Sequence, residues 1–318
     1  MAGKLSFTLK EYQEAATIWR KDLLMLPIIG ISDTTKFMTG RPGIRYKENV
    51  GEISASAQFA PYKAGRSKDA DLKLDFRTLE TYFGNVVAKF EPNTAISTLL
   101  GTGATKGDGQ MQTPTAKHVL ALIAKSLSES LNDALWSAKR NAAGDTTMDL
   151  FDGFDTITQQ EVLAGNIAED KGNYMKLTDE ITTANAVTIA KQILFSMDER
   201  LRAQTCYLYC TQDFADKYNE CYLLTHGGIQ YNTQYNQTTV EGSGGKLILC
   251  PLSNKVGSKF MQIAPKSNML YGYDQMSDVE SVMVKEFEPF ILSYIATMFF
   301  GVQFESIDKR RLKVVELA

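Results

Sequence analysis

The sequence predicts an α+β fold, and three features carry that prediction. Two segments of alternating polarity on either side of a basic tip, Gly51 to Thr78, predict an extended β-hairpin. A single apolar stripe over residues 114–141 predicts a long helix. Alternating helix and strand patterns over residues 177–276 predict a separate α/β unit. The chain of 318 residues, 44% hydrophobic and 22% charged, has room for one large domain or two.

The first 44 residues predict an N-terminal arm. A helix is expected from Leu9 to Leu24, and glycines and prolines then interrupt the chain between Pro27 and Gly43. That composition is typical of a segment that runs over a surface. The opening residues are amphipathic and include acids, so they do not have the pattern of a signal peptide.

The predicted hairpin, within residues 45–92, has one apolar face and a basic tip. Alternate positions on its two strands supply the apolar face, which consists of Ile53, Ala55, Ala57, Phe59, Leu72, Leu74 and Phe76. The tip between the strands carries Lys63, Arg66 and Lys68. A two-stranded ribbon is marginally stable alone in water, so this face needs a surface to lie on. A second β-rich segment, "YFGNVVAKFEP", ends at Pro92.

The glycine-rich stretch from Gly101 to Pro114 resembles a phosphate-binding loop only superficially. No Gly-Lys-Ser/Thr follows at the required place, and Lys106 stands where a dinucleotide fingerprint needs its third glycine. A surface loop is the expected structure. A hydrolase-like α/β enzyme that uses Lys106 is kept as a competing hypothesis, which loss of phosphate-ester turnover on mutating this lysine would support.

The long helix is expected to begin at Pro114, with Thr113 as its N-cap. Its apolar stripe recurs every three or four residues and consists of Ala116, Leu120, Ile123, Leu127, Leu131, Ala134 and Ala138. Lys139 and Arg140 are expected in its last turn, where cations suit the helix dipole. The strongly apolar strands predicted over residues 277–318 are expected to pack against this helix.

In the α/β unit we expect a helix capped by Thr178 or Asp179, a strand "CYLYC", a helix capped by Thr211, and strands "KLILC" and "FMQIA". A turn-rich connection, "PKSNMLYGYD", follows them. Between these elements lies a loop, Thr225 to Gly245, without lysine, arginine or aspartate. Such a loop is expected to be either a flexible surface loop or a segment at a rotation axis, where a neutral composition is suitable because a charge would face its own image. Its candidate residues are Gly227, Gly228, Asn232, Gln234, Asn236 and Gln237.

The residue pattern predicts no catalytic, cofactor-binding or metal site. The four cysteines and two histidines lack the spacing of zinc or redox motifs, so reduced, packing cysteines are expected. Aspartates between Asp145 and Asp155 do not follow an EF-hand loop and are interpreted as turn and cap residues. The net charge of −3 gives no basic excess of the kind that marks nucleic-acid binding. The longest apolar run, Phe290 to Phe304, is too short for a membrane-spanning helix.

The order of these elements resembles the major capsid proteins of tailed bacteriophages, the HK-ninety-seven type fold that encapsulins share. The hairpin corresponds to the family's E-loop. The family's spine helix corresponds to "PTAKHVLALIAKSLSESLNDALWSAKRN", and its Asp-Gly turn to "LFDGFDTI". The closing strands of the family correspond to the ending "PFILSYIATMFFGVQFESIDKRRLKVVEL", which contains Gly301. The resemblance implies an N-terminal arm (1–44), an E-loop region (45–92), a peripheral domain (93–176 and 277–318) with a spine helix at about 114–141, and an axial domain (177–276).

The resemblance also implies a function. The protein is expected to be a non-enzymatic shell protein that forms pentamers and hexamers, without a cofactor, around phage double-stranded DNA held by non-specific contacts. Ile53, Phe59, Lys63, Arg66, Lys68, Leu72, Leu74 and Phe76 are expected to contact neighbouring subunits, and the neutral loop to lie at the capsomer centre. The alternative is an encapsulin-like nanocompartment with a protein cargo.

Partners and location follow from the same resemblance. Many family members begin with a scaffolding segment that is later removed, whereas this chain enters the hairpin near residue 45, which favours a separate scaffold protein or none. A portal and cement proteins are further expected partners, and no membrane is involved. The expected location is the virion capsid, with assembly in the host cytoplasm. Lys63 or Lys68 is a candidate for the covalent cross-link that some members form, although exposed tips commonly carry lysines.

Overall fold

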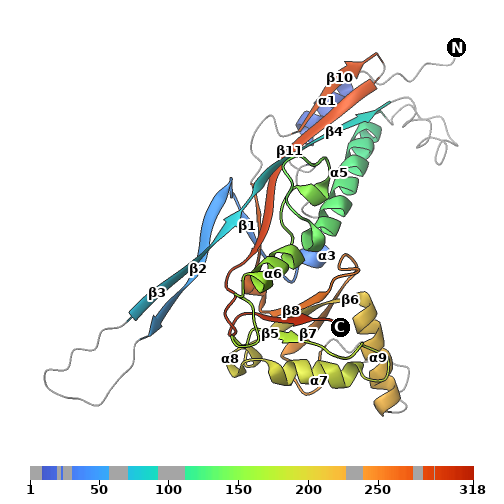
Figure 1. Cartoon of the computed structure of the whole chain (residues 1–318). Helices are drawn as coiled ribbons and strands as arrows, with labels where there is room; N and C mark the ends of the chain where they lie inside the picture. The colour runs from blue at the N-terminus through green and yellow to red at the C-terminus, as the bar shows by residue number, and fades with distance from the viewer. Residues whose placement is uncertain are drawn as a thin grey trace.

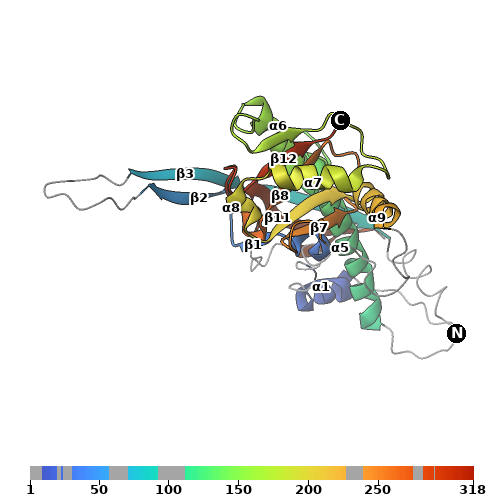
Figure 2. The ribbon, with the colours of Figure 1, turned by 90° about the horizontal axis from the view of Figure 1, so that it is seen from below.

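The computed structural model describes residues 9–19, 23, 31–56, 71–91, 112–226, 239–274, 282–289 and 291–318. Figure 1 shows an elongated body with two sheets, from which a two-stranded hairpin projects. The hairpin consists of β2 (Lys47–Ser56) and β3 (Asp71–Glu80). Figure 2, seen from below, shows the hairpin extending well beyond the helices of the body. The α+β fold class is therefore confirmed.

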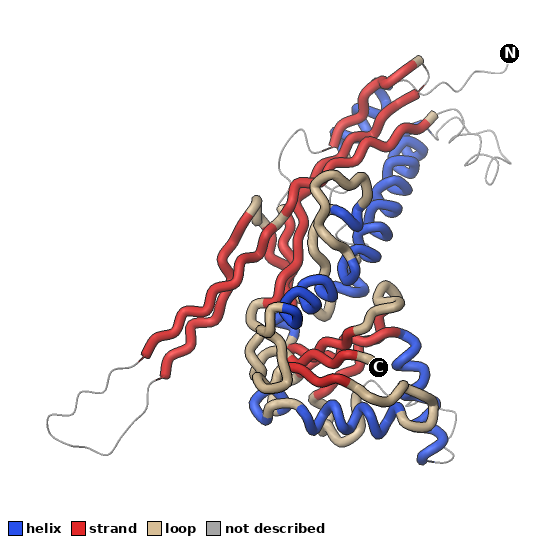
Figure 3. Tube along the Cα trace, viewed as in Figure 1, coloured by secondary structure: helices blue, strands red, loops and turns tan. Residues whose placement is uncertain are grey.

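The first sheet has the strand order β1-β9-β11-β10, with β4 also paired to β11. Its strands are β1 (Thr39–Pro42), β4 (Tyr82–Phe90), β9 (Met269–Tyr273), β10 (Val282–Glu288) and β11 (Ile291–Phe304). All neighbouring strands are antiparallel except β1 and β9, which are parallel. The long helix α5 (Gln112–Ser137) lies alongside this sheet (Figure 3). The helix α1 (Leu9–Ile18), at the start of the expected arm, packs against β10 and against the N-terminal half of α5.

The predicted apolar stripe of α5 faces the core. Leu120, Leu131, Ala134 and Ala138 are all buried, and the side chains of Val119 and Leu120 pack with those of β10 and β11. At the other end of the helix, Leu131 to Ala138 join a larger cluster with β11 and α6 (Phe154–Leu163). The expected packing of the closing strands on the long helix is confirmed.

The ends of α5 differ from the prediction. The helix begins at Gln112, so Thr113 lies inside it, and it ends at Ser137, so Lys139 and Arg140 lie outside it. The reason is that the following turn captures the chain. The Ala138 carbonyl accepts hydrogen bonds from the Gly153 amide (2.9 Å) and the Thr156 hydroxyl (2.6 Å), and the Lys139 amide donates to the Met148 carbonyl (2.9 Å).

The second sheet has the order β5-β12-β8-β6-β7. Its strands are β5 (Tyr174–Lys176), β6 (Cys206–Thr211), β7 (Leu247–Leu252), β8 (Phe260–Ala264) and β12 (Lys313–Glu316). The helices α7 (Ala186–Ser196) and α9 (Gln212–His226) share one buried cluster with these strands, and α8 (Glu199–Arg202) follows α7. Short helices occur at α3 (Ser32–Thr35), η1 (Thr147–Asp149) and η2 (Lys266–Asn268).

The predicted caps of this unit are right at one helix and wrong at the other. The Thr211 hydroxyl accepts the amide of Phe214 at 3.2 Å, which confirms Thr211 as a cap. The preceding helix begins at Ala186, so neither Thr178 nor Asp179 caps it. It also breaks at Met197, whose backbone is extended, before Asp198 caps α8. The apolar residues of α7, of the break and of α8 are nevertheless buried; they include Val187, Ala190, Leu194, Met197 and Leu201.

The segment "PKSNMLYGYD" is wrongly predicted as a mere connection, because it contains β9, a strand of the first sheet. Conversely, β5 and β12 belong to the second sheet although they lie in the expected peripheral segments. Strand pairing therefore does not follow the boundaries expected at residues 176 and 276. The division of the chain into peripheral and axial domains stays a prediction.

Gly301 marks the point where the hairpin meets β11. A Cβ atom at this position would lie 2.0 Å from the Glu80 carbonyl oxygen, which no real side chain tolerates. Glycine thus lets the backbone of β3 approach β11 closely. Gly153 has the same role at the end of α5, where a Cβ would lie 2.4 Å from the Trp136 carbonyl oxygen.

Candidate subunit interface

The hairpin has the pairing that its apolar face requires. Ile53 pairs directly with Leu74, Ala55 with Leu72, and Gly51 with Phe76. Residues that pair directly in an antiparallel ribbon share a face, and successive residues alternate between faces. The predicted apolar positions in the described part of the ribbon therefore lie on one face of it.

The hairpin's other face makes the contact with the body. Val50 and Leu79, which alternate with the apolar set, are buried in a small cluster with Ile44 and Leu270. Phe76 is the member of the apolar set whose side chain is described, and 58% of it is exposed. The apolar face and the anchored face of the hairpin are thus opposite faces.

Several predicted interface residues lie outside the described residues. At the hairpin these are Phe59, Lys63, Arg66 and Lys68, and for Ile53, Leu72 and Leu74 only the backbone pairing is described. Gly227, Gly228, Asn232, Gln234, Asn236 and Gln237 of the neutral loop also lie outside. The roles assigned to all these residues stay predictions.

A second exposed apolar surface lies on the first sheet and was not predicted. We define the outer sheet surface by the exposed side chains of Tyr46, Phe83 and Val87; Phe299, which both aromatic rings contact, is itself buried. Tyr46, Phe83 and Val87 are 67%, 57% and 49% exposed, and both aromatic rings approach the Phe299 ring, with centroids 5.1 and 5.0 Å apart. Cross-strand pairing sets Phe83 opposite Phe299. The segment "YFGNVVAKF" has apolar residues at both odd and even positions. The sequence alone therefore does not show which face of this strand is exposed.

A buried polar junction joins α6 and the end of α5 to the second sheet. The Lys255 ammonium, in the turn between β7 and β8, lies 2.6 Å from an Asp155 carboxylate oxygen on α6, and its side chain is fully buried. The Gln262 amide donates to the same oxygen at 2.7 Å, and the Lys255 nitrogen lies 4.0 Å from the centroid of the Trp136 ring. Burial lowers the pKa of Lys255, and the Asp155 carboxylate opposes that shift. Asp155 thus holds two parts of the body together and is no mere turn residue.

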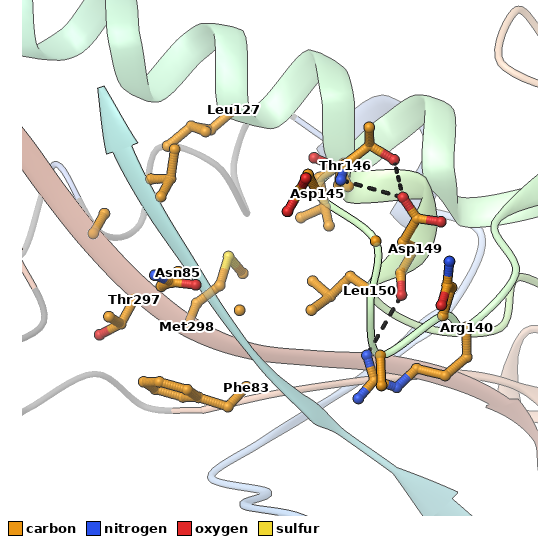
Figure 4. Close-up of a pocket in the computed structure, with 18 of the residues that line it drawn as sticks. Phe83, Asn85, Leu127, Arg140, Asp145, Thr146, Asp149, Leu150, Thr297 and Met298 are labelled. Carbon is orange, nitrogen blue, oxygen red and sulfur yellow. Dashed lines mark hydrogen bonds between the residues drawn. The ribbon is translucent and has the colours of Figure 1, made fainter. Parts of the chain in front are cut away.

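Figure 4 shows a cavity of about 450 Å³ between α5, β4, β11 and the turn that follows α5. Three of the polar residues that line it, Arg140, Thr146 and Asp149, are hydrogen-bonded to one another. The Asp149 carboxylate accepts from the amide and the hydroxyl of Thr146, the latter at 2.5 Å, in a capping box, and the Arg140 guanidinium donates to the Asp149 carbonyl at 3.5 Å. Neither histidine nor cysteine occurs among the described residues that line it.

The cysteines behave as packing residues. All four are free and buried, and burial raises the pKa of the Cys206 and Cys210 thiols to about 12. Such thiols stay protonated at neutral pH and are poor nucleophiles. Within the described ranges, no cluster of three or more His, Cys, Asp or Glu side chains could hold a metal ion. No described helix is both long and apolar enough to cross a membrane.

Comparisons with known proteins identify the fold. No protein-family model and no curated protein sequence matches the chain. Solved structures do match. The chain is 14% identical to a protein in the procapsid of satellite phage P4, with a TM-score of 0.55 over 91% of this chain and 97% of that one. A capsid protein of a native GTA particle gives 13% identity and a TM-score of 0.55 over 91% and 90% of the two chains.

A third match is the capsid of cyanophage A-1(L), at 10% identity and a TM-score of 0.53 over 92% of each chain. These identities are far too low to transfer residue roles, but the shared architecture spans nearly the whole chain. The hairpin, the long helix beside a sheet and the second α/β sheet all appear in the expected order. The chain therefore has the HK-ninety-seven type fold of the major capsid proteins of tailed bacteriophages.

Proposed function

We propose that this chain is a structural major capsid protein that assembles through pentamers and hexamers into an icosahedral shell around double-stranded phage DNA. The observation that carries the proposal is the projecting hairpin with an exposed Phe76 on its apolar face. Its own body already occupies the opposite face, through Val50 and Leu79. A second copy of the chain supplies the missing cover.

The outer sheet surface offers the complementary half of such a contact. Its exposed apolar side chains include Phe83 and Val87 on β4, where they alternate with the exposed polar residues Asn85 and Lys89. The hairpin and this sheet are different surfaces of one subunit, so their contact is heterologous and generates rings. In the proposed contact, the apolar residues of the hairpin cover this surface, and the basic residues of the tip meet acidic groups on a further subunit.

The energy of each contact is modest. Burying the exposed part of Phe76 contributes about 1 kcal/mol, since full burial of such a side chain contributes about 1.5–3 kcal/mol. A standard interface buries about 1,600 Å² in total. In a closed shell every subunit contacts several neighbours, so the contacts reinforce one another. The likeness of the fold to phage capsid proteins supports, as part of the proposal, a separate scaffold protein, a portal and cement proteins as further partners, with assembly in the host cytoplasm and a final place in the virion capsid.

The test is assembly itself. We expect rings or shells by negative-stain microscopy of the purified protein, and nuclease-protected DNA in shells isolated from producing cells. Well-separated 35 kDa particles at high concentration would contradict the proposal. Shells that hold a protein in place of DNA would favour the nanocompartment alternative.

A matched pair of variants tests the contact. Phe76→Ser should leave the monomer folded and reduce assembly, whereas Lys73→Ser, on the opposite face of the same strand, should assemble normally. Combining Phe76→Ser with serine at Phe59, Leu72 and Leu74 should abolish assembly. If these changes unfold the monomer, the ribbon belongs to the subunit's own core and the proposed contact is wrong.

A further inference from the structure

One group of contacts at the base of the hairpin does not fix its direction. The ion pair between Lys47 and Glu80 (2.5 Å) joins the two strands to each other, so it closes the ribbon without orienting it. The small apolar cluster of Ile44, Val50, Leu79 and Leu270 joins the ribbon to the body. Apolar contacts are non-directional, so a cluster of this size tolerates a change of tilt.

A second group of contacts is directional. The Arg77 guanidinium on β3 lies 2.6 Å from the Glu161 carboxylate on α6, and the same nitrogen donates to the Gln303 side-chain oxygen on β11 at 3.1 Å. The Gln303 amide nitrogen in turn donates to the Thr78 carbonyl at 3.2 Å. The side chains of Arg77 and Glu161 are each 17% exposed. Charge-assisted hydrogen bonds between largely buried groups are strong and depend on angle.

The partners of Arg77 are themselves fixed. The second oxygen of Glu161 accepts the Asn166 amide at 2.8 Å, and β11 lies at the centre of the first sheet. Beyond Arg77, β3 runs six residues further to Asp71, about 20 Å at ~3.4 Å per residue. A small tilt at Arg77 is therefore amplified to several ångströms at the far end of the ribbon.

We propose that Arg77, Glu161 and Gln303 form a direction lock that sets the angle at which the hairpin leaves the body. Arg77 lies on β3 of the ribbon, Glu161 on α6 and Gln303 on β11, so the lock connects the ribbon both to a helix and to the first sheet of the body. Resting on the proposed function, the second part of the inference is that this angle sets the curvature between neighbouring subunits, and hence the uniformity of the shell.

The angle can be measured in the unassembled full-length protein. Spin labels on Ser54→Cys in β2 and Glu220→Cys in α9 report the distance between ribbon and body by pulsed electron paramagnetic resonance. The native cysteines are buried and do not compete for label. We expect one narrow distance distribution in the parent protein, and a broadened or split distribution in Arg77→Met and Glu161→Gln.

Glu129→Gln is the matched control, because it removes the same charge from an exposed ion pair with Lys125 (3.9 Å) on α5. It should keep the narrow distribution. Unchanged distributions in Arg77→Met and Glu161→Gln, or a broad distribution in the parent, would overturn the direction lock. If Arg77→Met fails to fold by circular dichroism, Glu161→Gln, which preserves the shape of the side chain, decides the question.

Particle images test the second part separately. With the lock weakened, we expect shells of mixed diameter and open sheets, against uniform shells for the parent and for Glu129→Gln. Uniform shells from a variant whose ribbon distances are broadened would refute the link to curvature. If the parent itself forms no shells, the proposed function fails, while the distance measurement still decides whether the lock exists.

Discussion

The buried pair of Lys255 and Asp155 yields the sharpest stability prediction. Replacing Asp155 by asparagine keeps the size of the side chain but leaves the Lys255 ammonium, which is fully buried, without a counter-charge. The Trp136 ring, 4.0 Å from the nitrogen, compensates only in part. Breaking a buried pair in this way costs about 3–5 kcal/mol.

Replacing Lys255 by methionine should behave differently. It removes the buried charge, and Asp155 keeps its hydrogen bond from Gln262 at 2.7 Å and is 13% exposed. Replacing a whole buried ion pair by apolar groups of similar volume is often neutral or stabilising, and the carboxylate that this single change leaves behind is partly exposed and still hydrogen-bonded. We therefore expect Lys255→Met to change stability by about 1 kcal/mol or less, and to relieve most of the loss when combined with Asp155→Asn.

Urea unfolding of the unassembled protein measures both effects. The chain has two tryptophans, so a Trp19→Phe background makes Trp136, which touches Lys255, the sole fluorescent reporter of the junction. Protein concentration is held fixed, because association would add to apparent stability. If Asp155→Asn costs no more than Lys255→Met at an unchanged m-value, the pair does not act as a buried ion pair and our reasoning is refuted.

Three further predictions concern the close-packed glycine, the thiols and pH. Gly301→Ala should destabilise the protein by about 3 kcal/mol in thermal or urea unfolding, because the added Cβ would clash with the Glu80 carbonyl oxygen. Gly244→Ala is the control: its Cβ would lie in open space, so only the φ of +61° opposes it, at a cost of about 1 kcal/mol. A thiol reagent should label no cysteine in the native protein and all four in urea, and rapid native labelling would contradict their burial. Burial raises the pKa of the Cys206 and Cys210 thiols to about 12, against 9.0 when unfolded. Their contribution to stability is therefore complete below pH 9 and is lost as the pH rises from 9 to 12. Substituting both cysteines by alanine should make the free energy of unfolding fall less steeply with pH in that window.

The sequence predicted the elements whose periodicity is long and simple. The stripe of α5 and the alternating ribbon both appear, with Leu131 and Ala134 buried and Ile53 paired with Leu74. Helix ends were less predictable because tertiary contacts set them. The Ala138 carbonyl bonds to Gly153 and not to a following helical residue, so α5 stops before the cations that favoured a later end.

Sheet membership was not predictable from local pattern. Nothing in "MLYGY" shows that β9 belongs to the first sheet and pairs with β11, while the strand before it, β8, belongs to the second sheet. Which sheet a strand joins depends on partner strands far away in the sequence. The candidate interface divides in the same way. The apolar set of the hairpin follows from alternation, but the exposure of Phe83 and the pairing of Arg77 with Glu161 emerge only once distant elements are brought together.

The two strands of the ribbon have free edges, and these edges affect aggregation independently of the apolar face. Among the described residues this sheet consists of β2 and β3, so each is an edge strand whose outer margin carries backbone groups without a partner strand. Such margins invite uncontrolled pairing between molecules and fibre growth. The charges interspersed along them, Glu52, Lys73 and Asp75 among others, hinder indiscriminate stacking. These charges therefore oppose aggregation of the free protein through its ribbon.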